Sequence, residues 1–238
     1  MMFLDKQNRA LYQSWLDSAL TEGSVALIDK AADWTSFDVV AKLRSLTKIK
    51  KVGHAGTLDP FATGLLIVCF GKATKTIEDY QNLPKEYKAV MKLGATTKTD
   101  DFTAEEENIK GTDLLVIDSI QNLTKEFTGT ITQTPPQYSA KKISGRRAYE
   151  LARKNKEFKI EPVEVNIFKF EILNINLPYI EFIVACSKGT YIRAIARDFG
   201  EKLGCGGYLT ELRRTSIGDY KAENALNINE MIEISQVQ

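Results

Sequence analysis

The only histidine of the chain lies in the stretch Gly53-His-Ala-Gly-Thr-Leu-Asp-Pro60, together with two glycines and a carboxylate. Glycine lets the backbone take a positive φ and lets a ligand lie close to it, while Pro60 restricts the conformation of Asp59 before it. The uncharged segment at 62–70 would anchor this loop in the core. Such a loop can present a carboxylate as a nucleophile or as a partner for positive charge. Leu-Asp-Pro is also an ordinary turn or helix-start sequence, so a purely structural role stays open at this point.

Two further stretches hold candidate functional side chains. Tyr87 begins an alternation of apolar residues and lysines, which predicts a half-buried strand. Its ring could simply pack in the core, or it could offer a face for stacking and a hydroxyl for proton transfer. The stretch Ser187-Lys-Gly-Thr-Tyr-Ile-Arg193 precedes an amphipathic pattern. It could be an anion-binding helix start, although it lacks the spacing of a phosphate loop.

Positive charge is concentrated in one part of the chain. The formal net charge of the whole chain is only +1, which argues against indiscriminate binding of nucleic acid. Between residues 138 and 159, eight basic residues stand against two acidic ones, a local charge of 8 − 2 = +6. We expect a basic face formed by Lys141, Lys142, Arg146, Arg147, Arg153, Lys154, Lys156 and Lys159. Runs of this kind are also common on solvated surfaces that bind nothing.

Bulk composition restricts the class of protein. The 238 residues are 43% hydrophobic and 26% charged, as in globular proteins with a sizeable core. There is no apolar run of the roughly 20 residues that a membrane span needs, and the first residues lack the apolar core of a signal peptide. Three cysteines without Cys-x-x-Cys spacing and one histidine predict reduced thiols and no structural metal. We therefore expect a cytoplasmic protein.

The apolar pattern predicts both helices and strands around these stretches. Residues 1–22 have helical spacing and would form an amphipathic helix on the domain. A short strand at 24–28 would lead to a helix at 37–46 with Ser36 as its N-cap. The remaining predicted elements are a strand from Tyr87, a helix at 114–127 and strands at 161–170 and 180–186.

Three motifs, in the expected order, resemble those of the TruB family of tRNA pseudouridine synthases. They run from Gly53 to Lys75, from Lys85 to Asp100 and from Ser187 to Gly204, and the resemblance covers roughly residues 23–235. It implies a pseudouridine synthase fold, α+β, with a mixed and mostly antiparallel sheet flanked by helices and with an insertion that grips RNA. It also implies a catalytic domain at 23–238 after an N-terminal helical extension at 1–22, without the C-terminal RNA-binding PUA domain of many members.

The resemblance assigns roles to individual residues. Asp59 would be the catalytic carboxylate, Arg193 its ion-pair partner, and Tyr87 a catalytic residue that also stacks on the target base. The implied substrate-binding residues are His54, Tyr87, Tyr191, Leu212 and Lys30, and those implied to contact the RNA backbone are Lys141, Lys142, Arg146 and Arg147. No metal or other cofactor is implied, because nothing enters or leaves in an isomerisation.

The chain departs from the family pattern at one turn. Where the family has Asp-Lys-Pro-x-Gly-x-Thr-Ser, this chain has Asp29-Lys-Ala-Ala-Asp-Trp-Thr-Ser36, which lacks both the proline and the glycine. We expect the turn after Lys30 to be loosened or reshaped, because a fixed φ and a permissive residue are both lost.

The implied activity is isomerisation of uridine to pseudouridine at position 55 in the T arm of tRNA, by a monomer. Whether Asp59 would attack the ribose or the base is left open. Two other readings compete. One is a tRNA-binding and folding factor that uses the same surface without catalysis. The other is an aspartate-nucleophile hydrolase of small glycosides, which would leave the basic stretch unused.

Overall fold

A computed structural model describes residues 1–139, 141–143, 146–152, 154 and 158–236. The chain divides into two compact units. We refer to Met1–Tyr87 with Leu212–Gln238 as the Asp59 unit, and to Lys88–Glu211 as the Arg193 unit. Two strands, β5 (Lys85–Leu93) and β13 (Gly207–Ile217), contribute residues to both.

The Asp59 unit contains strands in the order β1-β2-β4-β13, with β3 paired to β4 and β14 to β13. The β1–β2 and β4–β13 pairs are parallel, whereas β2 and β3 both run antiparallel to β4. The bounds are β1 Phe3–Leu4, β2 Ser24–Lys30, β3 Val52–His54, β4 Thr63–Phe70 and β14 Tyr220–Lys221.

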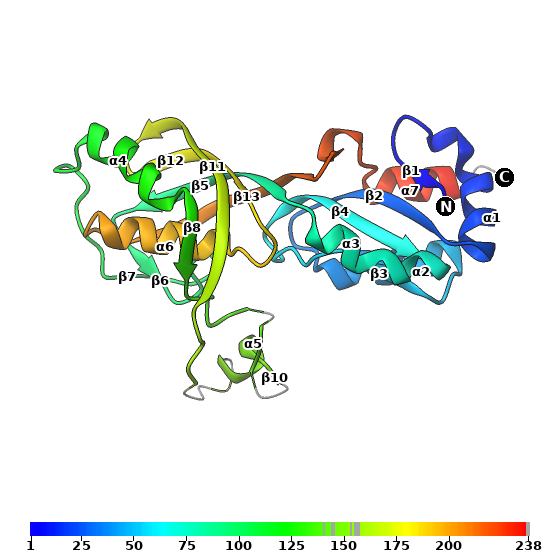
Figure 1. The fold of residues 1–238 in the computed structure, drawn as a ribbon, viewed down its shortest axis with the longest axis horizontal. Helices are drawn as coiled ribbons and strands as arrows, with labels where there is room; N and C mark the ends of the chain where they lie inside the picture. Colours follow the sequence, from blue (N-terminus) through cyan, green and yellow to red (C-terminus); the bar gives the residue numbers. More distant parts are fainter. Residues whose placement is uncertain (140, 144–145, 153, 155–157, 237–238) are drawn as a thin grey trace. The chain divides into compact units, whose positions relative to one another are not determined.

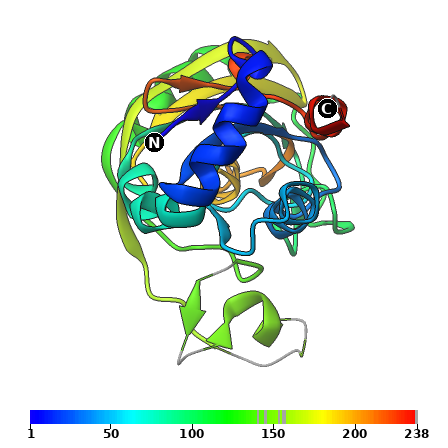
Figure 2. The same ribbon diagram turned by 90° about the vertical axis from the view of Figure 1, so that its right-hand side faces the viewer.

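The helices of this unit pack around β2 and β4. Figure 2 shows α1 in blue, α2 in light blue and α7 in red at the end that faces the viewer. The α-helices are α1 Tyr12–Thr21, α2 Ser36–Thr47, α3 Ile77–Asn82 and α7 Ile228–Gln236, and the short 3-10 helices are η1 Arg9–Leu11, η2 Gly71–Thr76 and η4 Ala222–Asn224.

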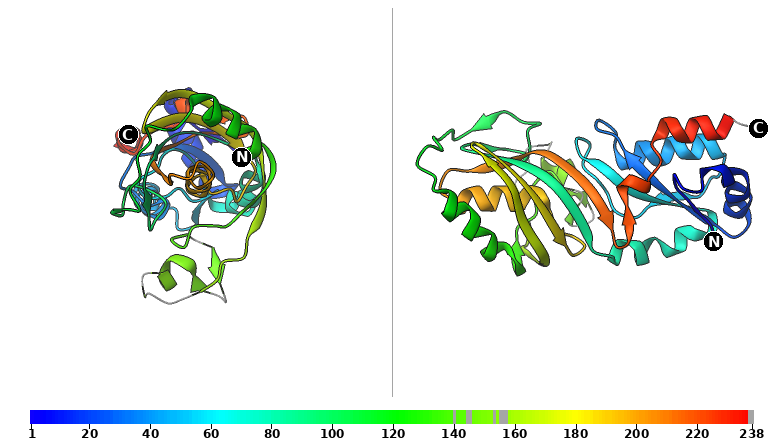
Figure 3. Two further views of the ribbon diagram at one scale, coloured as in Figure 1. Left: turned by 90° about the vertical axis from the view of Figure 1, so that its left-hand side faces the viewer. Right: turned by 90° about the horizontal axis from the view of Figure 1, so that it is seen from above.

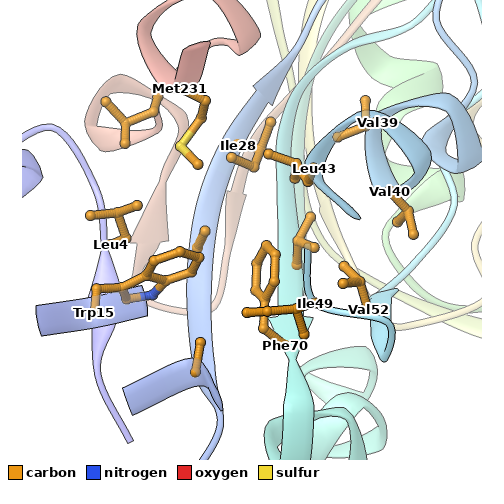
Figure 4. Packing of buried hydrophobic residues seen from close by; sticks show 14 of the residues in the cluster. Leu4, Trp15, Ile28, Val39, Val40, Leu43, Ile49, Val52, Phe70 and Met231 are labelled. Carbon is orange, nitrogen blue, oxygen red and sulfur yellow. The ribbon is translucent and has the colours of Figure 1, made fainter. Parts of the chain in front are cut away.

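Both faces of β2 and β4 are buried, which explains why their sequences are continuously apolar rather than alternating. On one face, Ile28 and Phe70 pack with Trp15 of α1 and Met231 of α7 (Figure 4). On the other face, alternate residues of the same strands form a second cluster with Tyr80 of α3. Trp15 is fully buried and its indole nitrogen donates to Val25 O at 2.9 Å, so α1 is part of this core. The predicted domain boundary at residues 22 and 23 stays a prediction.

The Arg193 unit contains strands in the order β13-β5-β12-β11-β8. β11 runs antiparallel to both β12 and β8. Two small hairpins, β6–β7 and β9–β10, lie outside this order. The bounds are β6 Thr96–Thr97, β7 Glu106–Glu107, α4 Ile117–Leu123, η3 Thr124–Phe127, β8 Gly129–Gln133, β9 Lys142–Ile143, β10 Arg146–Arg147, α5 Ala148–Ala152, β11 Val163–Asn176, β12 Tyr179–Cys186 and α6 Ile192–Lys202.

Helix α6 lies against the strands of the Arg193 unit (Figure 3). Its Phe199 contacts Phe127 of η3 and Phe170 of β11, with ring centroids 5.4 and 5.7 Å apart. Gly200 allows a close approach to the start of β13, since a Cβ there would lie 2.2 Å from the carbonyl carbon of Gly206. The fold is thus α+β with a mixed sheet flanked by helices, as predicted.

The predicted insertion lies between β8 and β11. Figure 1 shows β9, β10 and α5 as a small hairpin and helix set off from the strands of the same unit. The side chain of Lys141 donates to Glu161 O at 2.8 Å, and Arg146 is exposed. Arg153 and Lys156 lie outside the described residues, as do the side chains of Lys142 and Arg147. Contact of this insertion with RNA stays a prediction.

Candidate active site

Asp59 lies in the connection between β3 and β4, where the antiparallel pair opens into a loop. The pairing runs from Val52 opposite Phe70 to His54 opposite Val68, and Ala55 N donates to Ile67 O at 2.9 Å. Within the loop, Ala62 N donates to Asp59 O at 3.1 Å. His54 and Asp59 are both half-buried.

The first turn of α2 fixes the residue before Asp59. Ser36 is buried, and its hydroxyl accepts from Leu58 N at 2.9 Å and lies 3.3 Å from Leu58 O. The predicted capping role of Ser36 is wrong. Thr35 is the N-cap and forms a capping box with Asp38, and Ser36 is the first helical residue. The hydroxyl of Ser36 is therefore available to hold the Asp59 loop.

Lys30 holds two turns together at the end of β2. The residue is fully buried, and its ammonium donates to Ala31 O at 2.9 Å, Trp34 O at 2.6 Å and Pro60 O at 3.0 Å. Burial lowers the pKa of Lys30 to about 8, and the Asp59 carboxylate is the strongest influence that opposes this shift. Lys30 therefore stays mostly protonated at pH 7 and places a positive charge near Asp59. Its predicted contact with substrate stays a prediction.

The turn that departs from the family pattern is closed rather than loosened. Asp33 takes the left-handed conformation, with φ of 64°, at the position where the family has glycine. Aspartate tolerates that region better than most residues because its short polar side chain can bond locally. Asp33 N donates to Pro60 O at 3.0 Å, the same carbonyl that Lys30 contacts. The turn thus keeps its hold on the residue after Asp59.

Two arginines within β13 have partners near this site, Arg214 in the loop and Arg213 at Asp29 of β2, and sequence reasoning missed both. Arg214 is 1% exposed, and its guanidinium donates to Leu65 O at 2.7 Å and Gly56 O at 3.1 Å. Arg213 makes a bidentate pair with Asp29, at 3.0 and 2.7 Å. The only hint in the sequence was the pair of adjacent arginines that follows the apolar residues at the start of this strand. Their partners lie 149 to 184 residues away in the sequence, so that signal could not name them.

Two predicted pocket residues lie in the parts of β5 and β13 that belong to the Asp59 unit. Tyr87, in β5, is 9% exposed, and Leu212, in β13, is 7% exposed. Tyr87 follows the alternating burial that the sequence predicts for β5. The Asp59 unit therefore contains five of the predicted functional residues, namely Lys30, His54, Asp59, Tyr87 and Leu212.

Arg193 is the second residue of α6, and its guanidinium is held within the Arg193 unit. It is 4% exposed and donates to Thr99 O at 2.7 Å and Tyr138 O at 2.9 Å. A third contact is with the carboxylate of Asp101, at 3.4 Å. Asp101 in turn accepts from the hydroxyl of Thr99 at 2.7 Å. The guanidinium is therefore oriented before any substrate arrives. Asp59 belongs to the other unit, and its ion pair with Arg193 stays a prediction.

Tyr191, the predicted pocket tyrosine, is the N-cap residue of α6. The side-chain amide of Gln133 makes two bonds with its backbone, accepting from Tyr191 N at 2.8 Å and donating to Tyr191 O at 3.0 Å. Gln133 is 1% exposed at the end of β8. A glutamine before two prolines gives no sequence signal for such a clamp.

A second arginine, Arg197, lies one helical turn after Arg193. It donates to Asp100 at 2.9 Å, to Asp198 at 2.8 Å and to Thr134 O at 2.8 Å. Burial raises the pKa of Asp100 to about 6, although Arg197 and Arg193 lower it. The ion pair of Asp100 with Arg197 therefore depends on pH within an accessible range.

The described residues offer neither a helix suited to a membrane nor a cluster suited to a metal. No helix in that part of the chain is both long and apolar enough to cross a bilayer. Within the same residues, no group of three or more His, Cys, Asp and Glu side chains has an arrangement that could bind a metal ion.

Comparison with known proteins gives consistent results. The N-terminal domain of TruB family pseudouridylate synthases matches residues 44–192, and the C-terminal domain of tRNA pseudouridylate synthase B matches residues 193–238. A tRNA pseudouridine synthase B of Phocaeicola vulgatus is 46% identical, over 89% of this chain and 93% of that protein. Proteins of the same name from Bacteroides fragilis and Flavobacterium johnsoniae are 49% and 47% identical, each over 87% of this chain and over 91% and 93% of their own lengths.

Solved structures agree with this fold. A chain in the crystal structure of a Cbf5-Nop10-Gar1 complex matches with a TM-score of 0.71 and 29% identity, over 92% of this chain and 56% of that one. A chain in the structure of an H/ACA RNP bound to a substrate RNA containing 2′-deoxyuridine gives a TM-score of 0.68 and 27% identity, over 92% of this chain and 55% of that one. This chain thus spans just over half of each solved chain. The two family domains together match residues 44–238, and the relatives from Phocaeicola vulgatus and Bacteroides fragilis are 46% and 49% identical to this chain in sequence. The chain therefore belongs to the TruB family of pseudouridylate synthases and is an isomerase.

Proposed function

We propose that this enzyme converts uridine to pseudouridine at position 55 in the T arm of tRNA, with Asp59 as the catalytic carboxylate. The observation that carries the proposal is the support of the Asp59 loop. Ser36 holds Leu58 through a buried hydrogen bond, and Lys30 and Arg214 hold Pro60 and Gly56 through part-buried ones. A loop fixed on both sides of one carboxylate is suited to catalysis that requires accurate positioning. The names of the relatives supply the substrate class, tRNA.

The reaction breaks one bond and makes another in the same nucleoside. The C1′–N1 bond of uridine breaks, the uracil turns within the site, and a new bond joins C1′ to C5. The hydrogen on C5 leaves as a proton and N1 takes one up, so the atoms balance without an oxidant or a second substrate. Asp59 would serve as the nucleophile or stabilise positive charge at C1′.

The other predicted residues would prepare the carboxylate and the base. Arg193 would pair with Asp59 and keep it ionised, because an opposite charge at contact distance favours the carboxylate. Tyr87 would stack on the uracil and assist removal of the C5 proton. Tyr191 and Leu212 would line the pocket for the base, which must first leave the RNA stack. His54, in the strand before the Asp59 loop, would support the rearranged RNA loop, and Lys30 would act through the loop that it holds.

The RNA would be held mainly through its backbone. Lys141, Lys142, Arg146 and Arg147 of the insertion would contact phosphates of the T-arm stem, which positions the RNA without reading its sequence. We propose that the enzyme acts as a monomer in the cytoplasm, where tRNA is its macromolecular partner.

Incubation of the purified protein with an unmodified T-arm hairpin, followed by mapping of pseudouridine, tests this function. We expect pseudouridine at the position that corresponds to uridine 55 and at no other uridine. A binding factor would shift the hairpin in a binding assay and leave every uridine unchanged. A glycoside hydrolase would release free uracil and leave an abasic site. Either of these results would contradict the proposal.

A further inference from the structure

The segment that leads from β8 into the basic insertion is tied to α6 at several points. This root of the insertion, residues 134–138, begins with Thr134 and two prolines, both of which are buried. Proline fixes φ, so the segment has little conformational freedom of its own. The residue before it, Gln133, clamps the backbone of Tyr191 at the start of α6.

Two arginines of α6 continue this contact. Arg193 and Arg197 lie four residues apart, and side chains at that spacing lie on the same face of a helix. Arg193 donates to Tyr138 O at 2.9 Å, and Arg197 donates to Thr134 O at 2.8 Å. Both carbonyls belong to the root of the insertion. Each arginine also contacts the loop after β6, Arg193 at Thr99 O and Arg197 at Asp100.

Arg197 has no part in the chemistry proposed above, yet it is well fixed. Its side chain is 25% exposed, and its guanidinium is held in three directions by Asp100, Asp198 and Thr134 O. An isolated surface arginine that contributed only charge would not need this arrangement. The bonds to Asp100 and Asp198 fix the guanidinium, and the bond to Thr134 O joins it to the root of the insertion.

We propose that Arg197 is a positioning residue for RNA binding, which docks the root of the basic insertion on α6 so that the insertion meets the RNA stem in one orientation. The inference rests on the proposed function of the insertion. A docked root reduces the conformational freedom that the insertion loses when it binds, and this strengthens binding. Arg197 itself need not touch the RNA.

The test compares Arg197→Gln with wild type by KM and kcat for pseudouridine formation and by Kd for the T-arm hairpin. We expect KM and Kd to rise about tenfold, because one charge-assisted bond to the root is lost, while kcat at saturating RNA stays within about threefold. Arg197→Lys should behave almost like Arg197→Gln, since an ammonium cannot reach Asp100, Asp198 and Thr134 O with the planar geometry of a guanidinium. Lys202→Gln is the matched control. It removes the same charge from the same helix, where Lys202 pairs with Glu126 and does not contact the root, and it should leave KM and Kd unchanged.

A double-mutant cycle decides whether Arg197 acts through the insertion. The second variant replaces Lys141, Lys142, Arg146 and Arg147 by alanine. If Arg197 acts by docking the insertion, Arg197→Gln should add little to the Kd of this insertion variant. Equal effects of Arg197→Gln in both backgrounds would overturn the inference. So would an insertion variant that binds as wild type does, or a Lys202→Gln variant as weak as Arg197→Gln.

The outcomes separate this inference from the proposed function. A wild-type protein that binds the hairpin but forms no pseudouridine would contradict the proposed function, and the cycle in Kd would still test the docking role. If the wild-type protein forms pseudouridine but the two changes have additive effects on the free energy of hairpin binding, the proposed function stands and the docking role is overturned. Thermal unfolding midpoints equal to wild type show that the variants are folded.

Discussion

At the scale of single residues, the structure explains how the chain keeps a turn whose family residues it has lost. Asp33 accepts the left-handed conformation that glycine takes in the family pattern, with φ of 64°. Lys30, which the family pattern also has, donates to the carbonyls of Ala31 and Trp34 at the two ends of the turn. The turn is therefore closed without the proline and the glycine of the family pattern, and its bonds to Pro60 O are present.

We expect substitutions of Asp33 to follow backbone preference. The side chain is exposed, so Asp33→Gly should keep the free energy of unfolding within about 0.5 kcal/mol, while Asp33→Ala should lower it by about 1 kcal/mol. Denaturant unfolding at constant m-value measures the difference. Equal stability of the alanine and glycine variants would show that the conformation at residue 33 is not strained.

Lys30→Met should destabilise the protein although methionine matches the apolar stem of lysine. The change removes one part-buried donor from each of the carbonyls of Ala31, Trp34 and Pro60, the last of which keeps Asp33 N, and this should lower the free energy of unfolding by about 2–4 kcal/mol. Lys72→Met, an exposed change in η2 of the same unit, is the control and should stay within about 0.5 kcal/mol. A Lys30→Met variant as stable as the control would mean that the ammonium does not hold the two turns.

At the scale of elements, α6 depends on two close contacts, one steric and one electrostatic. Gly200 lies where α6 meets the start of β13, and Arg197 links α6 to Asp100 and to the root of the insertion. The amphipathic pattern predicted this helix, which runs over Ile192–Lys202. Helical periodicity contains no information about the distance to a neighbouring strand, so the need for glycine at residue 200 could not be predicted.

Gly200→Ala should be destabilising although alanine favours helix by about 1 kcal/mol over glycine. The new Cβ would lie 2.2 Å from the carbonyl carbon of Gly206, which is backbone and cannot turn away. We expect a net loss of about 3 kcal/mol or more in the free energy of unfolding, measured in denaturant. Glu201→Ala, at the exposed neighbouring position, should have little effect. A Gly200→Ala protein of unchanged or higher stability would contradict the close packing.

The Asp100–Arg197 pair should make RNA affinity depend on pH. The pKa of Asp100 is raised to about 6 by burial, with Arg197, Arg193 and Asp198 as the charged groups around it. As pH falls through 6 the Asp100 carboxylate is protonated and Arg197 loses one of its two carboxylate partners, the other being Asp198, so Kd for the hairpin should rise between pH 7 and pH 5. The Asp100→Asn variant should bind the hairpin more weakly at pH 7, and its Kd should not rise further between pH 7 and pH 5. If Kd of the Asp100→Asn variant still rises between pH 7 and pH 5, the pH dependence belongs to another group.

At the scale of the whole molecule, the sequence motifs were sufficient to predict the family and the α+β class. The same motifs were placed correctly in the elements, with Asp59 in a loop, Tyr87 in a strand and Arg193 at the start of a helix. What the sequence could not supply is the set of supporting partners. Arg214 and Gly56 are 158 residues apart, and Gln133 and Tyr191 are 58 apart. Such pairs meet only in the folded chain, and local propensity or spacing cannot identify them.

The central claim is that Asp59, in its supported loop, performs the chemistry. Single-turnover formation of pseudouridine by Asp59→Asn, with saturating enzyme and a T-arm hairpin, tests it most directly, and hairpin binding is measured in parallel. Asp79→Asn, an exposed change in α3 of the same unit, is the control for folding and charge. We predict that Asp59→Asn binds the hairpin within about threefold of wild type but reacts about 10³-fold more slowly or not at all. An Asp59→Asn enzyme that forms pseudouridine at a rate close to that of wild type would contradict the account.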